Sequence, residues 1–116
     1  MAGEEVLNQG GQNIGLDVEE VSNGIEALGK LSKRPYSMVV TDLEMPRMDG
    51  FELLTELRRS PALAGLPVVV ASTESRPATR RRALDLGAHA FVAKPIDQDE
   101  LARVAGTLLN RAAGRP

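Results

Sequence analysis

Three polar residues follow short apolar runs, and their chemistry suits the handling of a phosphoryl group. Asp42 comes after Met38–Thr41, Ser72 ends a valine-rich run, and Lys94 follows another apolar run. A carboxylate can attack phosphorus and carry the group as an acyl phosphate. A hydroxyl can hold one phosphoryl oxygen, and an ammonium can neutralise another as a point charge. The sequence therefore predicts a phosphoryl site if the fold brings the three side chains together.

Apolar runs alternate with helical patterns along the chain, which predicts an α/β fold with a parallel sheet and helices on both faces. The expected strands are residues 16–21, 38–41, 68–72 and 90–93, and the expected helices are 24–31, 50–59, 77–86 and a last one that Asp97 caps. The first run alternates between apolar and polar residues, which is typical of an edge strand. In a parallel sheet the strand C-termini share one edge, and ligands bind beyond it. Residues 42, 72 and 94 can therefore converge.

The composition restricts the class of protein. The chain has 116 residues, enough for one domain and too few for two, so residues 1–116 are expected to form a single domain with a disordered tail at 112–116. The net charge of −2 gives no field that favours nucleic acid or a membrane surface. No apolar run approaches the roughly 18 residues of a membrane span, and no signal peptide is evident. With no cysteine in the chain, these features favour a cytoplasmic protein.

The motifs and their spacing closely resemble the receiver domain of two-component response regulators, the CheY-like type with a flavodoxin-like fold. Thr41-Asp42, followed by Met45-Pro46 and Met48-Asp49-Gly50, is similar to the phosphoacceptor strand and loop of that family. Ser72-Thr73 is similar to its Ser/Thr switch position, and Lys94-Pro95 to its Lys-Pro pair. The resemblance covers nearly all of the chain after the first fifteen or so residues.

The resemblance implies a signalling module and not an enzyme. Asp42 would accept a phosphoryl group from a histidine kinase or phosphotransfer protein, and Ser72 and Lys94 would stabilise it. Phe91 stands where the family carries an aromatic residue that rotates on activation, so Ser72 and Phe91 would switch a surface for a downstream protein partner. Mg²⁺ would be held by Asp42, by the backbone carbonyl of Glu44 and by two further acids.

Those two acids have no obvious place in this sequence. The family begins with an apolar strand that ends in an acidic pair, and counting back from Asp42 puts that pair before Met1. The chain is therefore expected to lack the usual first, central strand. Unpaired backbone groups would then cost about 1–3 kcal/mol each, which a rearranged sheet or a homodimer would have to offset. Alternatively, Glu4-Glu5 replaces the pair, which makes Glu5 a candidate metal ligand.

Other functions remain open at this level. A phosphorylation-independent pseudo-receiver, acting as a protein-binding or dimerisation module, would need no metal acids. A small phosphatase is disfavoured because neither a general base nor a complete metal set is visible. The run Arg80–Arg82 predicts a solvated helix face, with a partner or nucleic acid as the alternative. His89 is predicted to be a loop residue, since no second histidine exists to build a metal site.

Overall fold

The computed structural model describes residues 5–8, 17–20, 23–44 and 48–112, which form an open parallel sheet flanked by helices. Within this part of the chain the sheet has the strand order β2-β1-β3-β4-β5. This is the flavodoxin-like order 2-1-3-4-5, so the expected fold class is confirmed. The strands are β1 (Glu5–Asn8), β2 (Asp17–Glu20), β3 (Met38–Asp42), β4 (Val68–Ser72) and β5 (Ala90–Ala93).

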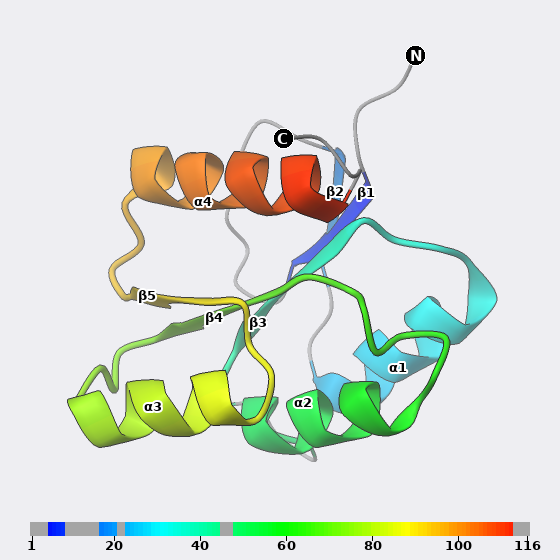
Figure 1. The fold of residues 1–116 in the computed structure, drawn as a ribbon, viewed down its shortest axis with the longest axis horizontal. Coiled ribbons are helices and arrows are strands. Elements are labelled where there is room, and N and C mark those ends of the chain that lie inside the picture. The colour runs from blue at the N-terminus through cyan, green and yellow to red at the C-terminus, as the bar shows by residue number, and fades with distance from the viewer. Residues whose placement is uncertain (1–4, 9–16, 21–22, 45–47, 113–116) are drawn as a thin grey trace.

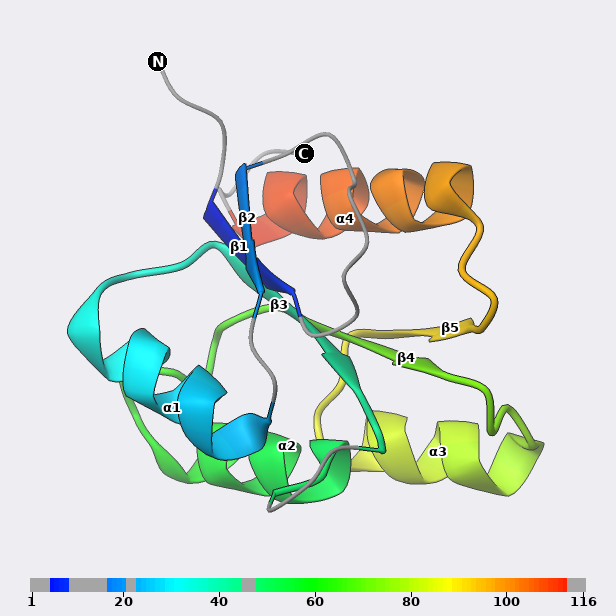
Figure 2. The same cartoon turned by 180° about the vertical axis from the view of Figure 1, so that it is seen from behind.

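Helices cover both faces of the sheet, as expected. They are α1 (Gly24–Lys33), α2 (Gly50–Arg59), α3 (Pro77–Asp85) and α4 (Gln98–Ala112). Figures 1 and 2 show α1, α2 and α3 on one face and α4 on the other. The expected disordered tail is wrong for Ala112, which ends α4, and residues 113–116 lie outside the described residues. No helix in the described segments is long and apolar enough to cross a bilayer.

The expectation that the chain lacks the central first strand is wrong. β1 occupies that position and pairs in parallel with both neighbours: Val6 is opposite Val18 of β2 and opposite Met38 of β3. Its two apolar residues, Val6 and Leu7, are enough for a short strand because the flanking strands supply the hydrogen-bonding partners. The sheet is thus continuous within one chain, so no second chain is needed to supply a central strand.

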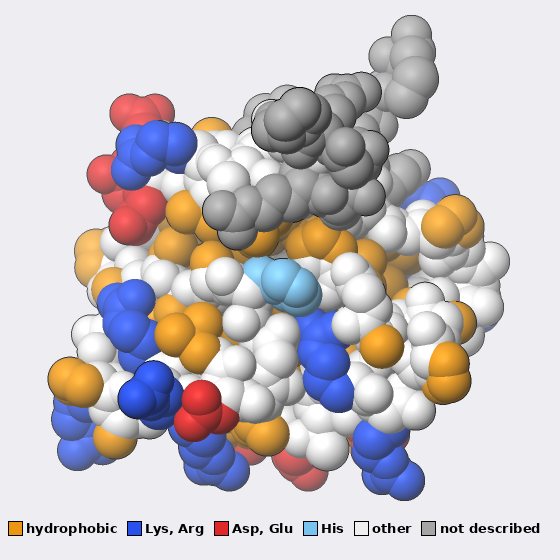
Figure 3. Space-filling view, viewed as in Figure 1, with side chains coloured by type: hydrophobic (Ala, Val, Ile, Leu, Met, Phe, Trp, Pro, Cys, Tyr) orange, Lys and Arg blue, Asp and Glu red, His pale blue; other side chains and the backbone are white. Residues whose placement is uncertain are grey.

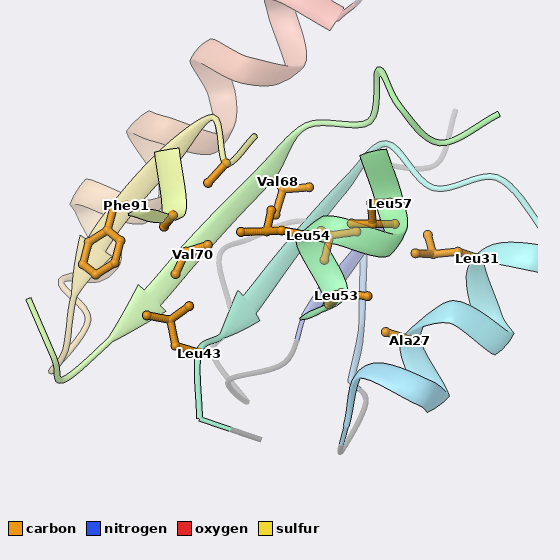
Figure 4. Packing of buried hydrophobic residues seen from close by; sticks show 12 residues of the cluster. Ala27, Leu31, Leu43, Leu53, Leu54, Leu57, Val68, Val70 and Phe91 are labelled. Carbon is orange, nitrogen blue, oxygen red and sulfur yellow. The ribbon is translucent and has the colours of Figure 1, made fainter. Parts of the chain in front are cut away.

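Two apolar clusters hold the helices on the sheet. Strands β3 and β4 contribute alternate residues to each, as the period of a strand requires. Figure 4 shows the cluster under α1, α2 and α3, in which Phe91, Val70 and Leu43 lie at one end and Ala27 and Leu31 at the other. The cluster under α4 consists of Met38, Val40, Val69, Ala71, Val92, Leu101, Ala105 and Leu108. Burying each large side chain stabilises the fold by about 1.5–3 kcal/mol.

Side-chain caps fix where three of the helices begin. Asn23 accepts a hydrogen bond from the Glu26 N–H at 2.9 Å. Asp49 forms a capping box with Glu52, in which each side chain accepts a backbone N–H of the other residue. Asp97 accepts two N–H groups from the first turn of α4, as the sequence predicts. Each cap satisfies backbone donors that would otherwise have no partner at the helix end.

Candidate functional site

The C-terminal tips of three adjacent strands bring Asp42, Ser72 and Lys94 to one edge of the sheet. β4 lies between β3 and β5, with Asp42 opposite Ala71 on one side and Ser72 opposite Ala93 on the other. The Lys94 N–H donates to the Ser72 carbonyl at 2.9 Å, which continues the ladder beyond β5. The three residues therefore lie at the C-terminal ends of adjacent strands, beside the β1/β3 boundary where the strand order reverses. Ligands of open α/β sheets bind at such a point.

Asp42 and Lys94 form an ion pair across the end of β4. The Lys94 ammonium contacts Oδ2 of Asp42, while Oδ1 accepts the Glu44 N–H at 3.1 Å. The side chain of Asp42 is 17% exposed and that of Lys94 is 25% exposed. That exposure leaves the carboxylate reachable from solvent, yet both charges are buried enough that losing one partner would be costly. The Lys94–Pro95 peptide bond is cis.

The Ser72 hydroxyl lies fully buried at the tip of β4. Its Oγ accepts the Glu74 N–H at 2.9 Å, which leaves the hydroxyl hydrogen available for donation. The neighbouring residue, Thr73, is exposed, and its hydroxyl donates to the Glu44 carboxylate at 3.4 Å. Hydrogen bonds and the charge of Arg76 lower the pKa of the Glu74 carboxyl, which faces Arg76 and not Asp42.

Gly50 allows helix α2 to begin directly against the backbone that carries Asp42. The Gly50 N–H donates to the Leu43 carbonyl at 3.0 Å. A Cβ added at Gly50 would lie 2.6 Å from the Asp42 carbonyl oxygen and 2.9 Å from the Leu43 Cα. The sequence predicts that a helix begins at residue 50, but this close approach was missed. The available signal was a glycine directly after a capping acid.

The metal ligands expected from the resemblance are only partly present. Strand register places Glu5 at the start of β1, at the opposite edge of the sheet from Asp42, so its expected role as a ligand is wrong. β1 ends instead in Asn8, opposite Val40, and residues 9–16 contain no Asp or Glu. The described residues hold no cluster of three or more potential ligands among His, Cys, Asp and Glu. Asp42 and the backbone carbonyl of Glu44 alone do not match a site built from several carboxylates.

Phe91 is buried on the same face of the sheet as Val70, to which it is paired in register. The Arg80 guanidinium lies 5.0 Å from the centre of its ring, and Arg82 lies 4.0 Å from the ring of Phe51. In the view of Figure 3, Lys and Arg side chains gather at the lower left, where Figure 1 places α3. The expected solvated face is thus exposed, but two of its three arginines also stack on aromatic rings, which sequence reasoning missed.

His89 lies in the turn before β5, as predicted, and its contacts are structural. Its Nδ1 accepts the Val68 N–H at 3.2 Å, and its own N–H donates to the Val68 carbonyl at 2.8 Å. The pKa of His89 is lowered because its ring is partly withdrawn from solvent and because Arg58 lies nearby. The Arg58 guanidinium also donates to the carbonyls of Ala64 and Gly87, which ties α2 to two loops.

Comparison with known proteins decides the family. A model of the response regulator receiver domain matches residues 4–105. The chain belongs to this family. The two-component response regulator ORR12 of Oryza sativa subsp. japonica is 41% identical to this receiver domain over 88 residues, which cover 75% of this chain and 73% of that protein.

Solved structures agree with the fold. The signal receiver domain of a histidine kinase from Syntrophus aciditrophicus is 31% identical, with a TM-score of 0.82 over 93% of this chain and 91% of that one. The receiver domain of sensor histidine kinase PA1611 from Pseudomonas aeruginosa PAO1 is 23% identical, with a TM-score of 0.82 over 94% of this chain and 98% of that one. That structure has a magnesium ion coordinated in its active-site cleft. This chain spans only 10%, 44% and 46% of three other curated relatives it matches.

Proposed function

We propose that this receiver domain accepts a phosphoryl group on Asp42 from a phosphohistidine of a histidine kinase or phosphotransfer protein. The observation that carries the proposal is the Asp42–Lys94 ion pair across the tip of β4, the strand that ends in Ser72. An unpaired lysine is rarely buried at the end of an apolar strand, because an ammonium loses its hydration there. Lys94 therefore has a specific reason to face the carboxylate.

The proposed transfer uses the side chains already in place. A carboxylate oxygen of Asp42 attacks phosphorus, a P–O bond forms, and the P–N bond to the donor histidine breaks. The electron pair of that bond goes to the imidazole nitrogen, which takes a proton from solvent, so that the histidine leaves as the neutral ring. Lys94 balances the charge of the phosphoryl oxygens, and Ser72 donates its hydroxyl hydrogen to one of them. The domain is thus proposed to carry a phosphoryl group and to signal its phosphorylated state, and not to turn over a substrate.

Magnesium is common in this family, as the PA1611 structure illustrates. In this chain Asp42 and the Glu44 backbone carbonyl could contribute ligands, but no carboxylate follows β1 within residues 9–16. We therefore assign the stabilisation of the transferred group to Lys94 and Ser72.

The output is proposed to pass through Ser72 and Phe91, which share one face of the sheet. Movement of the Ser72 hydroxyl toward a phosphoryl oxygen would change the packing beside Phe91 and so alter a surface that a downstream protein contacts. A cytoplasmic location and a homodimer remain predictions. The chain spans less than half the length of three curated relatives that it matches, so any activity of a longer protein that contains this domain is also a proposal.

The direct test is incubation with a small phosphodonor, with and without Mg²⁺, followed by intact mass measurement. We expect one added phosphoryl group on the wild-type chain and none on Asp42→Asn, whose amide cannot form the acyl phosphate. Ser72→Ala should still form the adduct, but more slowly. An adduct of equal yield on Asp42→Asn would place the acceptor elsewhere and refute the assignment.

One observation favours a second function, that of a phosphorylation-independent pseudo-receiver. Residues 9–16 lack the acids that the family places after its first strand. If no adduct forms with either the small donor or a phosphorylated phosphotransfer protein, while the chain binds a partner equally well as wild type and as Asp42→Asn, the pseudo-receiver function would replace the first.

A further inference from the structure

Helix α3 is held to the domain in an unusual way, because its own apolar contribution is small. Among the residues of α3 only Ala83 is buried, and its N-cap residue, Arg76, makes no side-chain capping bond. Leu84 is 41% exposed and so adds little to the core. Most helices in proteins are stabilised chiefly by packing of an amphipathic face. The position of α3 must therefore depend on other contacts.

Two arginines of α3 provide those contacts, and each stacks on a different phenylalanine. Arg82 lies over Phe51 at the start of α2. Arg80 lies over the ring of Phe91 and also approaches the Phe91 carbonyl, with Nη1 3.4 Å from that oxygen. The first contact joins α3 to a neighbouring helix, whereas the second joins it to strand β5.

The contact with Phe91 is the one that can report on the phosphoryl site. Phe91 is opposite Val70 in β4, and Ser72 follows two residues later on the same face of that strand. Ser72, Val70 and Phe91 therefore lie on one face of the sheet, and the Arg80 guanidinium lies over the Phe91 ring. Phe91 is 7% exposed, so the apolar core and the Arg80 guanidinium together leave little of it open to solvent.

We propose that Arg80 is the positioning residue that transmits the conformation of Phe91 to helix α3. With Phe91 inward, its ring and carbonyl hold Arg80, and Arg80 holds the helix. When the ring leaves this position, the contact is lost and α3 is released. This inference rests on the proposed function only in taking Phe91 as the residue that changes position, and it assigns the receiving group on the helix.

The sequence offers a clean experiment, because the chain contains just two phenylalanines, each under its own arginine. The 116-residue chain labelled with 4-fluorophenylalanine gives one ¹⁹F resonance for each ring. Arg82→Gln assigns the Phe51 signal. Arg80→Gln removes the charge but keeps the polar chain, and Arg81→Gln is the matched control, since it makes the same charge change at an exposed neighbour.

We expect Arg80→Gln to shift the Phe91 resonance and to raise the population with a solvent-exposed ring by about two- to fivefold, the change that loss of a surface cation–π contact allows. Arg80→Lys keeps the cation, so its Phe91 resonance and exposed-ring population should lie between those of Arg80→Gln and wild type. An effect of Arg81→Gln on the Phe91 signal as large as that of Arg80→Gln would overturn the proposal.

Transmission to the helix is tested by hydrogen exchange over residues 77–85. Arg80→Gln and Phe91→Leu should each speed exchange there, and the double variant should exceed neither single variant if both act through one contact. Additive effects would contradict the coupling. If Arg80→Gln does not fold, Arg80→Lys supplies the same comparison at smaller amplitude. Every measurement is made without a phosphodonor, so a failure of phosphorylation would refute the proposed function and leave this result intact.

Discussion

Replacing Gly50 with alanine should destabilise the domain even though alanine is the better helix former. At Gly50 an added Cβ would sit 2.6 Å from the Asp42 carbonyl oxygen and 2.9 Å from the Leu43 Cα. Both are backbone atoms and cannot rotate away, so α2 or the end of β3 must move. Overpacking of this kind costs about 1–3 kcal/mol, against a gain of at most about 1 kcal/mol from helix propensity. The expected net loss is about 1–2 kcal/mol.

Gly29 provides the matched control within the same fold. It lies inside α1, and an added Cβ there has nothing within 4 Å. Gly29→Ala should therefore stabilise the domain by about 0.5–1 kcal/mol through the lower conformational entropy of the unfolded chain. Urea unfolding of both variants measures the difference, with the slope of the transition as a check that the unfolded states are comparable.

The opposite signs of the two effects are the decisive result. If Gly50→Ala is as stable as wild type, the close approach of α2 to Asp42 does not constrain the chain, and the reasoning fails. If it is destabilised as expected, the phosphorylation yield provides a second readout. The shift needed to accommodate the Cβ moves the Asp42 backbone, so adduct formation should fall by more than in Gly29→Ala.

Three further variants test separate contacts. Asp49→Ala removes the acceptor of a capping box and should lower the free energy of unfolding by about 1 kcal/mol in urea titrations, whereas no change would mean that water replaces the cap. Gly87→Ala places a side chain at φ 110° against Arg58 and should cost about 1–2 kcal/mol, part of which an added Arg58→Ala should recover. The pKa of His89 is lower in the folded protein than its unfolded value of about 6.5. The neutral ring therefore contributes fully to stability above about pH 6.5, and this contribution is lost as the pH falls from there through the folded pKa. His89→Asn, which keeps an acceptor for the Val68 N–H, should reduce the loss of stability as the pH falls below about 6.5; equal slopes would exclude the histidine as its source.

Most of the fold could be predicted because local signals agree with the final structure. The valine-rich runs of β3 and β4 and the cap at Asp97 each mark an element in the sequence alone. β1 could not be predicted in this way. It has only Val6 and Leu7 as apolar residues, with Glu5 and Asn8 at its ends, and its place in the sheet is set by pairing with two distant strands.

The candidate site could also be predicted only in part. Asp42, Ser72 and Lys94 could be placed together from topology, because parallel strands present their C-termini at one edge. Contacts that depend on side-chain direction could not. The stacking of Arg80 on Phe91 joins a helix to a strand, and no spacing rule within either element encodes it. The expected role of Glu5 failed because a strand start and a strand end lie at opposite edges of the sheet.

The charge of the site explains how a receiver could function with fewer acids. Three carboxylates and one lysine, the set that the family resemblance implies, sum to a net charge of minus two, which a divalent cation would neutralise. Here β1 ends in Asn8, residues 9–16 are free of acids, and the Asp42–Lys94 pair is neutral by itself. The same change that removes metal ligands therefore removes much of the repulsion that an incoming phosphoryl group would meet.

We expect the rate of adduct formation to differ little between magnesium and a chelator. Asn8→Asp, which returns an acid to the end of β1, should slow the reaction in the chelator and restore a response to magnesium. A wild-type chain that forms adduct only with magnesium would show that other groups supply the negative charge, and the electrostatic argument would be wrong.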